Sequence, residues 1–83
     1  MNLKSIIIKA MEESANIRGT ILKEELSEKS ILLESGLDSL GYAIVITKLE
    51  DDLGYDPFTI MEEAFYPATL GELIEVYEKY KPE

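Results

Sequence analysis

The sequence predicts an all-α protein: a single domain over residues 1–83, folded as a bundle of three longer helices and one short one with a long first loop. Three observations predict it. Apolar residues recur at helical spacing in several stretches, capping residues stand where those stretches begin, and no stretch alternates as a strand does. Helices that are apolar on one face must bury those faces against each other, so we expect an antiparallel bundle.

The first helix is expected over residues 3–15, and a long loop over 16–37 follows it. In the helix, apolar residues share one face and charged residues take the other. A loop of this length in a compact domain is unusual unless apolar side chains pin it to the core. The expected helix face comprises Leu3, Ile6, Ile7, Ala10 and Met11. Two apolar groups of the loop could each form one short helical turn or anchor the loop to the core: Ile21, Leu22 and Leu26, and Ile31, Leu32 and Leu33.

The second helix, over residues 39–53, has the clearest pattern. Asp38 is a favourable N-cap residue and Gly54 suits the position that ends a helix. We expect one apolar stripe to face the core and the opposite side to face solvent. The predicted stripe comprises Tyr42, Ile46, Leu49 and Leu53, widened by Val45.

Two further capping motifs predict the remaining helices. Thr59 and Glu62 have capping-box spacing, which predicts a short helix limited by Pro67. Thr69 and Glu72 have the same spacing and predict a last helix that runs to about residue 80. The residues that this last helix should bury are Leu70, Leu73, Ile74 and Tyr77.

Composition excludes several kinds of chemistry. The chain has no cysteine and no histidine, which excludes a disulfide framework, a thiolate nucleophile of its own and a Ser-His-Asp triad. Residues 1–37 carry a net charge of −1 and residues 38–83 a net charge of −8. Such a surface repels nucleic acid and attracts basic protein patches. Without a signal peptide or a run of about 20 apolar residues, we expect a soluble cytoplasmic monomer with no membrane span.

Ser39 is the candidate for chemistry. A nucleophile elbow needs glycine two residues before the serine, where this chain has Leu37, so hydrolase chemistry is not expected. Because Asp38 fills the cap, the Ser39 hydroxyl lies in the first helical turn, where free N–H groups favour a phosphate. The acidic residues from Glu50 to Asp56 lack the spacing of a calcium-binding loop, so no metal site is predicted.

The stretch from Leu32 to Phe58, LLESGLDSLGYAIVITKLEDDLGYDPF, resembles the centre of acyl carrier proteins and peptidyl carrier domains. The shared features are a loop that ends in G-x-D-S-L, an amphipathic helix after the serine and an acidic end, LEDDLG. The resemblance implies a four-helix acyl-carrier-like bundle that is not itself an enzyme. It also implies that 4′-phosphopantetheine, supplied by coenzyme A, is attached to Ser39 and holds an acyl or aminoacyl group as a thioester.

The resemblance further implies a set of site residues and partners. Asp38 orients the modification site, and Leu40 is an exposed contact for partner enzymes. These partners are a phosphopantetheinyl transferase, an adenylate-forming acyl or aminoacyl ligase, and a downstream synthase, transferase or thioesterase. The predicted partner-binding face of the second helix comprises Leu40, Gly41, Ile44, Thr47, Lys48 and Asp51.

The sequence is compatible with three functions. The predicted face is largely neutral before residue 50, which favours a carrier of a specialised biosynthetic pathway. A housekeeping carrier of fatty-acid synthesis is the first alternative. The alternative of another class is an acidic helical adaptor domain that binds a basic partner and is never modified.

Overall fold

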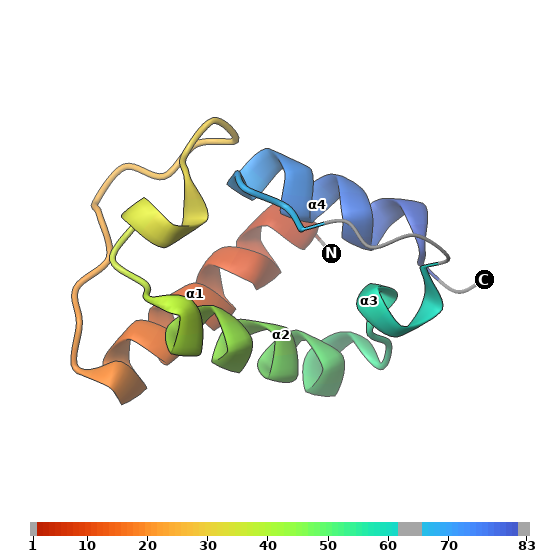
Figure 1. The fold of residues 1–83 in the computed structure, drawn as a ribbon, viewed down its shortest axis with the longest axis horizontal. Coiled ribbons are helices and arrows are strands. Elements are labelled where there is room, and N and C mark those ends of the chain that lie inside the picture. The colour runs from red at the N-terminus through yellow and green to blue at the C-terminus, as the bar shows by residue number, and fades with distance from the viewer. Residues whose placement is uncertain (1, 62–65, 82–83) are drawn as a thin grey trace.

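The computed structural model describes residues 2–61 and 66–81, and these residues are mostly helical. In chain order they form α1 (Leu3–Arg18), the short 3₁₀ turn η1 (Leu32–Glu34), α2 (Ser39–Leu53), α3 (Pro57–Ile60) and α4 (Leu70–Lys79). Figure 1 shows α2 along the bottom of the view and α4 along the top, with α1 passing behind them and the loop after α1 reaching the start of α4. The described residues form no strand, only one isolated bridge between Ile31 and Thr69. The predicted all-α class is therefore confirmed for this part of the chain.

Local capping sets the ends of the long helices. Gly19 adopts a left-handed conformation (φ 72°) and ends α1, which runs three residues beyond the predicted 3–15. Gly54 does the same for α2 (φ 82°), as predicted. At the start of α4, the Thr69 side chain accepts a hydrogen bond from the Glu72 backbone and the Glu72 side chain accepts one from the Thr69 backbone. This capping box is also as predicted.

The short helix α3 begins earlier than predicted. Asp56 is its N-cap, with the carboxylate accepting a hydrogen bond from Phe58 N (2.9 Å), and Pro57 occupies the first turn. Thr59 is therefore inside the helix, and its hydroxyl donates to the Asp56 carbonyl. The prediction that Thr59 opens this helix is wrong, because a proline preorganised for the first turn follows a better capping residue. Glu62 lies outside the described residues.

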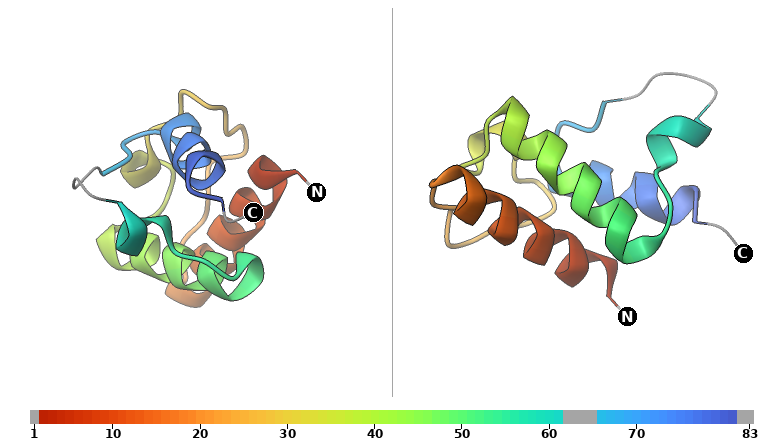
Figure 2. Two further views of the ribbon diagram at one scale, coloured as in Figure 1. Left: turned by 90° about the vertical axis from the view of Figure 1, so that its right-hand side faces the viewer. Right: turned by 90° about the horizontal axis from the view of Figure 1, so that it is seen from below.

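The core lies between α1, α2 and α4, which Figure 2 shows from two further sides. The four predicted residues of α4 are buried, and Tyr77 is fully so. On α1, Leu3 and Ile6 are only half-buried, whereas the other three predicted residues are fully buried. The buried apolar core comprises Ile7, Ala10, Met11, Ala15, Leu32, Leu37, Val45, Leu49, Tyr55, Leu70, Leu73, Ile74 and Tyr77.

The loop between α1 and α2 is anchored less by side chains than the sequence predicts. Of its six predicted anchors, only Leu32 is fully buried, Leu22 and Leu26 are half-buried, and Ile21 is 89% exposed. Ile31 and Leu33 are also exposed, so these three residues do not anchor the loop. The alternative, a short helical turn at the second group, is confirmed by η1, which Ile31 precedes as its N-cap. The backbone carries the attachment instead. Hydrogen bonds join Leu32 N to Ala68 O, Leu70 N to Ser30 O and Gly71 N to Glu28 O.

Among the described residues, no helix is both long enough and apolar enough to cross a membrane.

Candidate functional site

Ser39 is the first residue of α2, and its side chain is exposed. The end of the loop is held at this position because Leu37, two residues before Ser39, is buried in the core. Asp38 supplies the helix cap: its Oδ1 accepts a hydrogen bond from Gly41 N at 2.7 Å. Local sequence therefore places a hydroxyl at the helix start without using it for capping, as predicted.

The second carboxylate oxygen of Asp38 has a partner that the sequence does not predict. Arg18, the last residue of α1, places its Nη2 at 2.7 Å from Asp38 Oδ2. The hydrogen bond from Arg18, followed by that from Gly41, holds the pKa of the Asp38 carboxyl below its usual value. Twenty residues separate the two side chains, and no motif links them, so only the packing of α1 against α2 reveals the pair.

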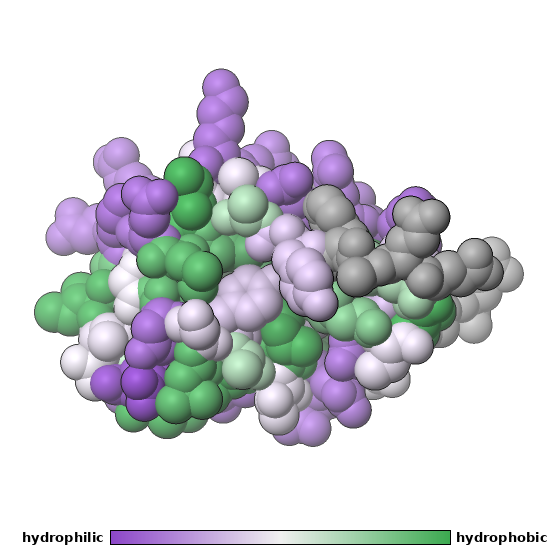
Figure 3. All heavy atoms as spheres, in the orientation of Figure 1, coloured by the Kyte–Doolittle hydropathy of each residue, from purple (hydrophilic) through white to green (hydrophobic). Residues whose placement is uncertain are grey.

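An apolar groove begins at Ser39. Its first hollow, of about 210 Å³, is lined by Leu33, Ser39, Tyr42, Tyr66 and Pro67. A second hollow of about 320 Å³ shares Tyr42 and Tyr66 with it and is completed by Ala43, Ile46 and Phe58. We call the two together the α2–α3 groove. Figure 3 shows apolar and near-neutral side chains gathered across the middle of this face of the molecule.

The inner face of α2 is rotated by about one residue from the prediction. Gly41, Val45 and Leu49 are buried, whereas Tyr42 and Ile46 are half-buried. The reason is the close packing of α2 on α1, where the buried Ser14 hydroxyl donates to the Gly41 carbonyl at 2.6 Å. A Cβ on Gly41 would stand 3.2 Å from Leu37 Cδ2 and from Asp38 Oδ1, so a larger residue here would press on the segment that leads into α2.

The predicted partner-binding face therefore needs correction. Gly41 is not on the outer face, because it is buried against α1. Ile44 is half-buried, and Lys48 is half-buried in an ion pair with Glu13 of α1, with Nζ at 3.1 Å from Oε2. The exposed residues of the predicted face are Leu40 (55% exposed), Thr47 and Asp51, and the prediction missed Ala43 and Glu50. The rotation explains these two omissions, since both lie just beyond Thr47 around the helix, on the side away from the buried Gly41.

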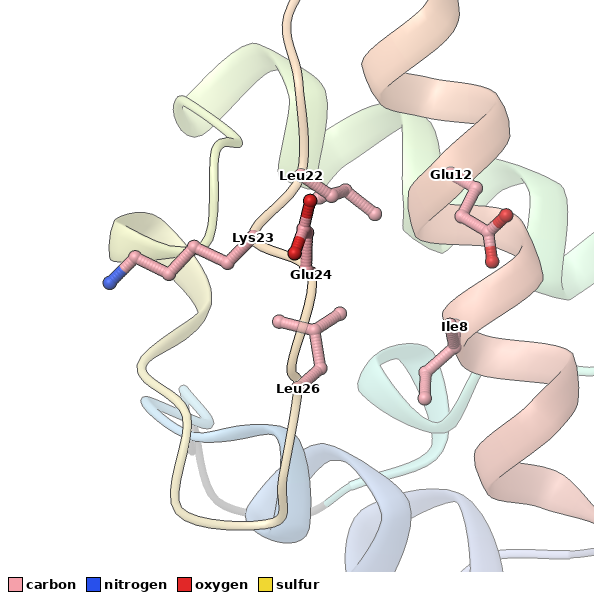
Figure 4. A pocket seen from close by; sticks show the side chains of 6 residues that line it. All are labelled: Ile8, Glu12, Leu22, Lys23, Glu24 and Leu26. Carbon is pink, nitrogen blue, oxygen red and sulfur yellow. The ribbon is translucent and has the colours of Figure 1, made fainter.

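A further hollow, of about 500 Å³, lies between α1 and the loop that follows it. Ile8, Leu22 and Leu26 point across this space toward one another, while Lys23 points away (Figure 4). Two carboxylates, Glu12 and Glu24, complete its lining. The lining has no convergent set of donors or acceptors, and the hollow shares no residue with the α2–α3 groove.

Acidic side chains do not converge anywhere in the part of the chain that the structure describes: no group of three or more could hold a metal ion. The acidic end of α2 is an exposed surface, with Glu50, Asp51 and Asp52 all in contact with solvent.

No family model, curated protein or solved structure matches this chain.

Proposed function

We propose that this protein is a discrete carrier of acyl or aminoacyl groups, which it holds as thioesters on a 4′-phosphopantetheine arm attached to Ser39. The observation that carries the proposal is the exposed Ser39 hydroxyl at the start of α2, between Asp38 and the exposed Leu40, at the mouth of the α2–α3 groove. The G-x-D-S-L stretch that resembles carrier proteins supplies the chemistry expected of this serine.

The surroundings of Ser39 suit the attachment of a phosphate ester. The first turn of a helix carries about half a positive charge and free N–H groups, and both stabilise a phosphodiester there. In the attachment step, the Ser39 oxygen bonds to the phosphorus that bears pantetheine, and the pyrophosphate bond of coenzyme A breaks. Adenosine 3′,5′-diphosphate leaves, and the serine proton passes to a base of the transferase, since this chain has no histidine to receive it.

The composition fits a carrier that does not catalyse the chemistry by itself. A chain without cysteine has no thiol of its own, and the attached arm supplies the thiol that forms the thioester. Two residues of this chain then have defined roles: Asp38 caps the start of α2, and Ser39 accepts the arm. The α2–α3 groove lies beside Ser39.

The exposed side of α2 is the surface proposed for partner enzymes. Leu40, Ala43 and Thr47 make its half nearest Ser39 neutral, and the acidic residues begin at Glu50. A docking contact near the reactive arm is therefore apolar, with acidic residues farther along the helix to attract basic patches. This distribution favours a carrier for a specialised pathway, loaded by an adenylate-forming ligase, over a housekeeping fatty-acid carrier.

Intact-mass measurement tests the proposal and separates it from an unmodified adaptor. The protein is incubated with coenzyme A and a broad-specificity phosphopantetheinyl transferase, and the product is mapped by peptide mass spectrometry. We expect one phosphopantetheine per chain, on Ser39, in the wild type and in the matched control Ser30→Ala, and none in Ser39→Ala. An unchanged mass, or labelling that survives Ser39→Ala, contradicts the proposal.

A further inference from the structure

Arg18 is the only arginine of this acidic chain, and the fold places it beside the residue that precedes Ser39. It is the last residue of α1, because Gly19 ends the helix directly after it. Its Nη2 donates to Asp38 Oδ2 at 2.7 Å. An arginine at the C-terminus of a helix also interacts favourably with the helix dipole, but that interaction does not depend on what Ser39 carries.

The Arg18 guanidinium has hydrogen-bond donors to spare. A guanidinium carries several N–H groups in a planar fork, and the pair with Asp38 is the only hydrogen bond or ion pair that this side chain makes with the residues that the structure describes. The side chain is 35% exposed, so its remaining donors can reach a group that arrives from solvent. Carboxylates and phosphates are the anions that this fork fits best. Arg18 can therefore bind a second anion while it keeps Asp38.

A phosphate attached to Ser39 would stand next to the Asp38 carboxylate, which is a like charge. The two residues are consecutive, with Cα atoms about 3.8 Å apart, so salt at physiological strength screens the repulsion between the two anions only in part. Two ion pairs join α1 to α2 among the described residues, and only the one made by Arg18 lies at the start of α2. The other, between Lys48 and Glu13, lies farther along both helices. Arg18 is thus the cation placed to offset the added charge.

We propose that Arg18 binds the phosphate of the attached arm: in the modified protein its guanidinium donates to the Asp38 carboxylate and to a phosphate oxygen of the group on Ser39. This inference rests on the proposed carrier function and adds a residue of α1 to the attachment site. The base of the arm is then tied to both helices, which limits the directions in which the arm leaves the surface. Arg18 takes no part in forming the ester bond.

The test compares the melting temperatures of the unmodified and the fully modified protein, with coenzyme A as the donor and intact mass as the check of loading. In Arg18→Gln, modification should lower the melting temperature by about 2–6 °C relative to its effect on the wild type. Arg18→Lys keeps the charge and should recover part of this difference. The matched control Lys48→Gln removes the same charge and the other ion pair between α1 and α2, and should respond to modification as the wild type does. Equal responses of the wild type and Arg18→Gln overturn the inference.

Nuclear magnetic resonance separates phosphate binding from a purely structural role of Arg18. The Nε–Hε signal of Arg18 should move when the wild type is modified. The ³¹P signal of the arm should differ between the wild type and Arg18→Gln, and should be the same in the wild type and Lys48→Gln. A ³¹P signal that is unchanged in Arg18→Gln overturns the inference, because Arg18 then holds Asp38 alone. Failure to add mass at Ser39 refutes the carrier function itself, which is a distinguishable result.

Discussion

Arg18 Nη2 lies 2.7 Å from Asp38 Oδ2, so the last residue of α1 is paired with the cap of α2. Both oxygens of the Asp38 carboxylate are engaged, one by Arg18 and one by Gly41 N. The residue that precedes Ser39 is thus fixed in position from two sides. Asp38 acts here as a structural joint between two helices as well as a flank of the candidate modification site.

The first prediction concerns acid stability. The pKa of Asp38 is lowered in the folded protein, chiefly by the hydrogen bond from Arg18. A lowered folded-state pKa gives stability that is present above the unfolded value, about 3.9, and is lost as the pH falls through the folded value. Asp38→Asn keeps a capping side chain but loses the ionised partner. Its melting temperature should therefore fall less than that of the wild type between about pH 5 and pH 2.

Circular dichroism melts of both proteins across this pH range measure the difference. The matched control is Asp52→Asn, which removes an exposed acid from the far end of α2 and should follow the wild-type pH profile. Parallel profiles for Asp38→Asn and the wild type would show that the Arg18 contact contributes nothing in solution.

The second prediction concerns the joint between α1 and α2. Ser14 is fully buried, and its hydroxyl donates to the Gly41 carbonyl. Ser14→Ala leaves that buried carbonyl with one partner fewer, and we expect the free energy of unfolding to fall by about 1–2 kcal/mol. Urea denaturation measures this loss. Ser5→Ala, on the exposed side of the same helix, should change it by less than about 0.5 kcal/mol, and equal effects of the two changes would refute the buried hydrogen bond.

The third prediction concerns the attachment of the first loop to α4. Gly71 donates its backbone N–H to Glu28 O, and a Cβ built on Gly71 would stand 2.9 Å from that same oxygen. Gly71→Ala should therefore push the loop away and lower the free energy of unfolding by about 1–3 kcal/mol, despite the higher helix propensity of alanine. Amide hydrogen exchange at position 71 and at Leu32 should become faster.

Glu75→Ala is the control for that experiment, because Glu75 is exposed on the same helix. It should leave both the stability and the exchange rates close to those of the wild type. If Gly71→Ala stabilises the protein, helix propensity outweighs the close approach, and the loop does not lie where it is described.

The fourth prediction separates the inner and outer faces of α2. Leu49 is fully buried, and Leu49→Ala should cost about 2–5 kcal/mol of unfolding free energy. Leu40 is 55% exposed, so Leu40→Ala should change stability by less than about 0.5 kcal/mol. The exposed leucine beside Ser39 is nevertheless a candidate contact for the transferase, and we expect its loss to slow modification of Ser39 several-fold.

Denaturant melts and a time course of phosphopantetheine incorporation measure the two effects. Thr47→Ala is the control for position on the same exposed face, and it should alter modification less than Leu40→Ala because it removes little apolar surface. A Leu40→Ala protein that is as unstable as Leu49→Ala would mean that the face of α2 near Ser39 is buried.

The sequence by itself determined the helical class, the cap at Asp38, the end of α2 at Gly54 and the capping box of Thr69 and Glu72. These features follow from short-range chemistry, because a cap is satisfied within three or four residues of chain. The sequence alone also shows that this chain has no histidine and no cysteine, which excludes a Ser-His-Asp triad and a thiolate nucleophile.

Only the tertiary structure decided how α2 is rotated, which loop residues are buried and what pairs with Asp38. Periodicity predicts that a helix has an apolar side, but the line of closest contact depends on the partner helix. Here the Ser14 hydroxyl of α1 donates to the Gly41 carbonyl, and Lys48 forms an ion pair with Glu13. Arg18 and Asp38, at opposite ends of the first loop, form a second ion pair. Contacts between residues so far apart in the chain leave no mark in local spacing, since they form only when the helices pack.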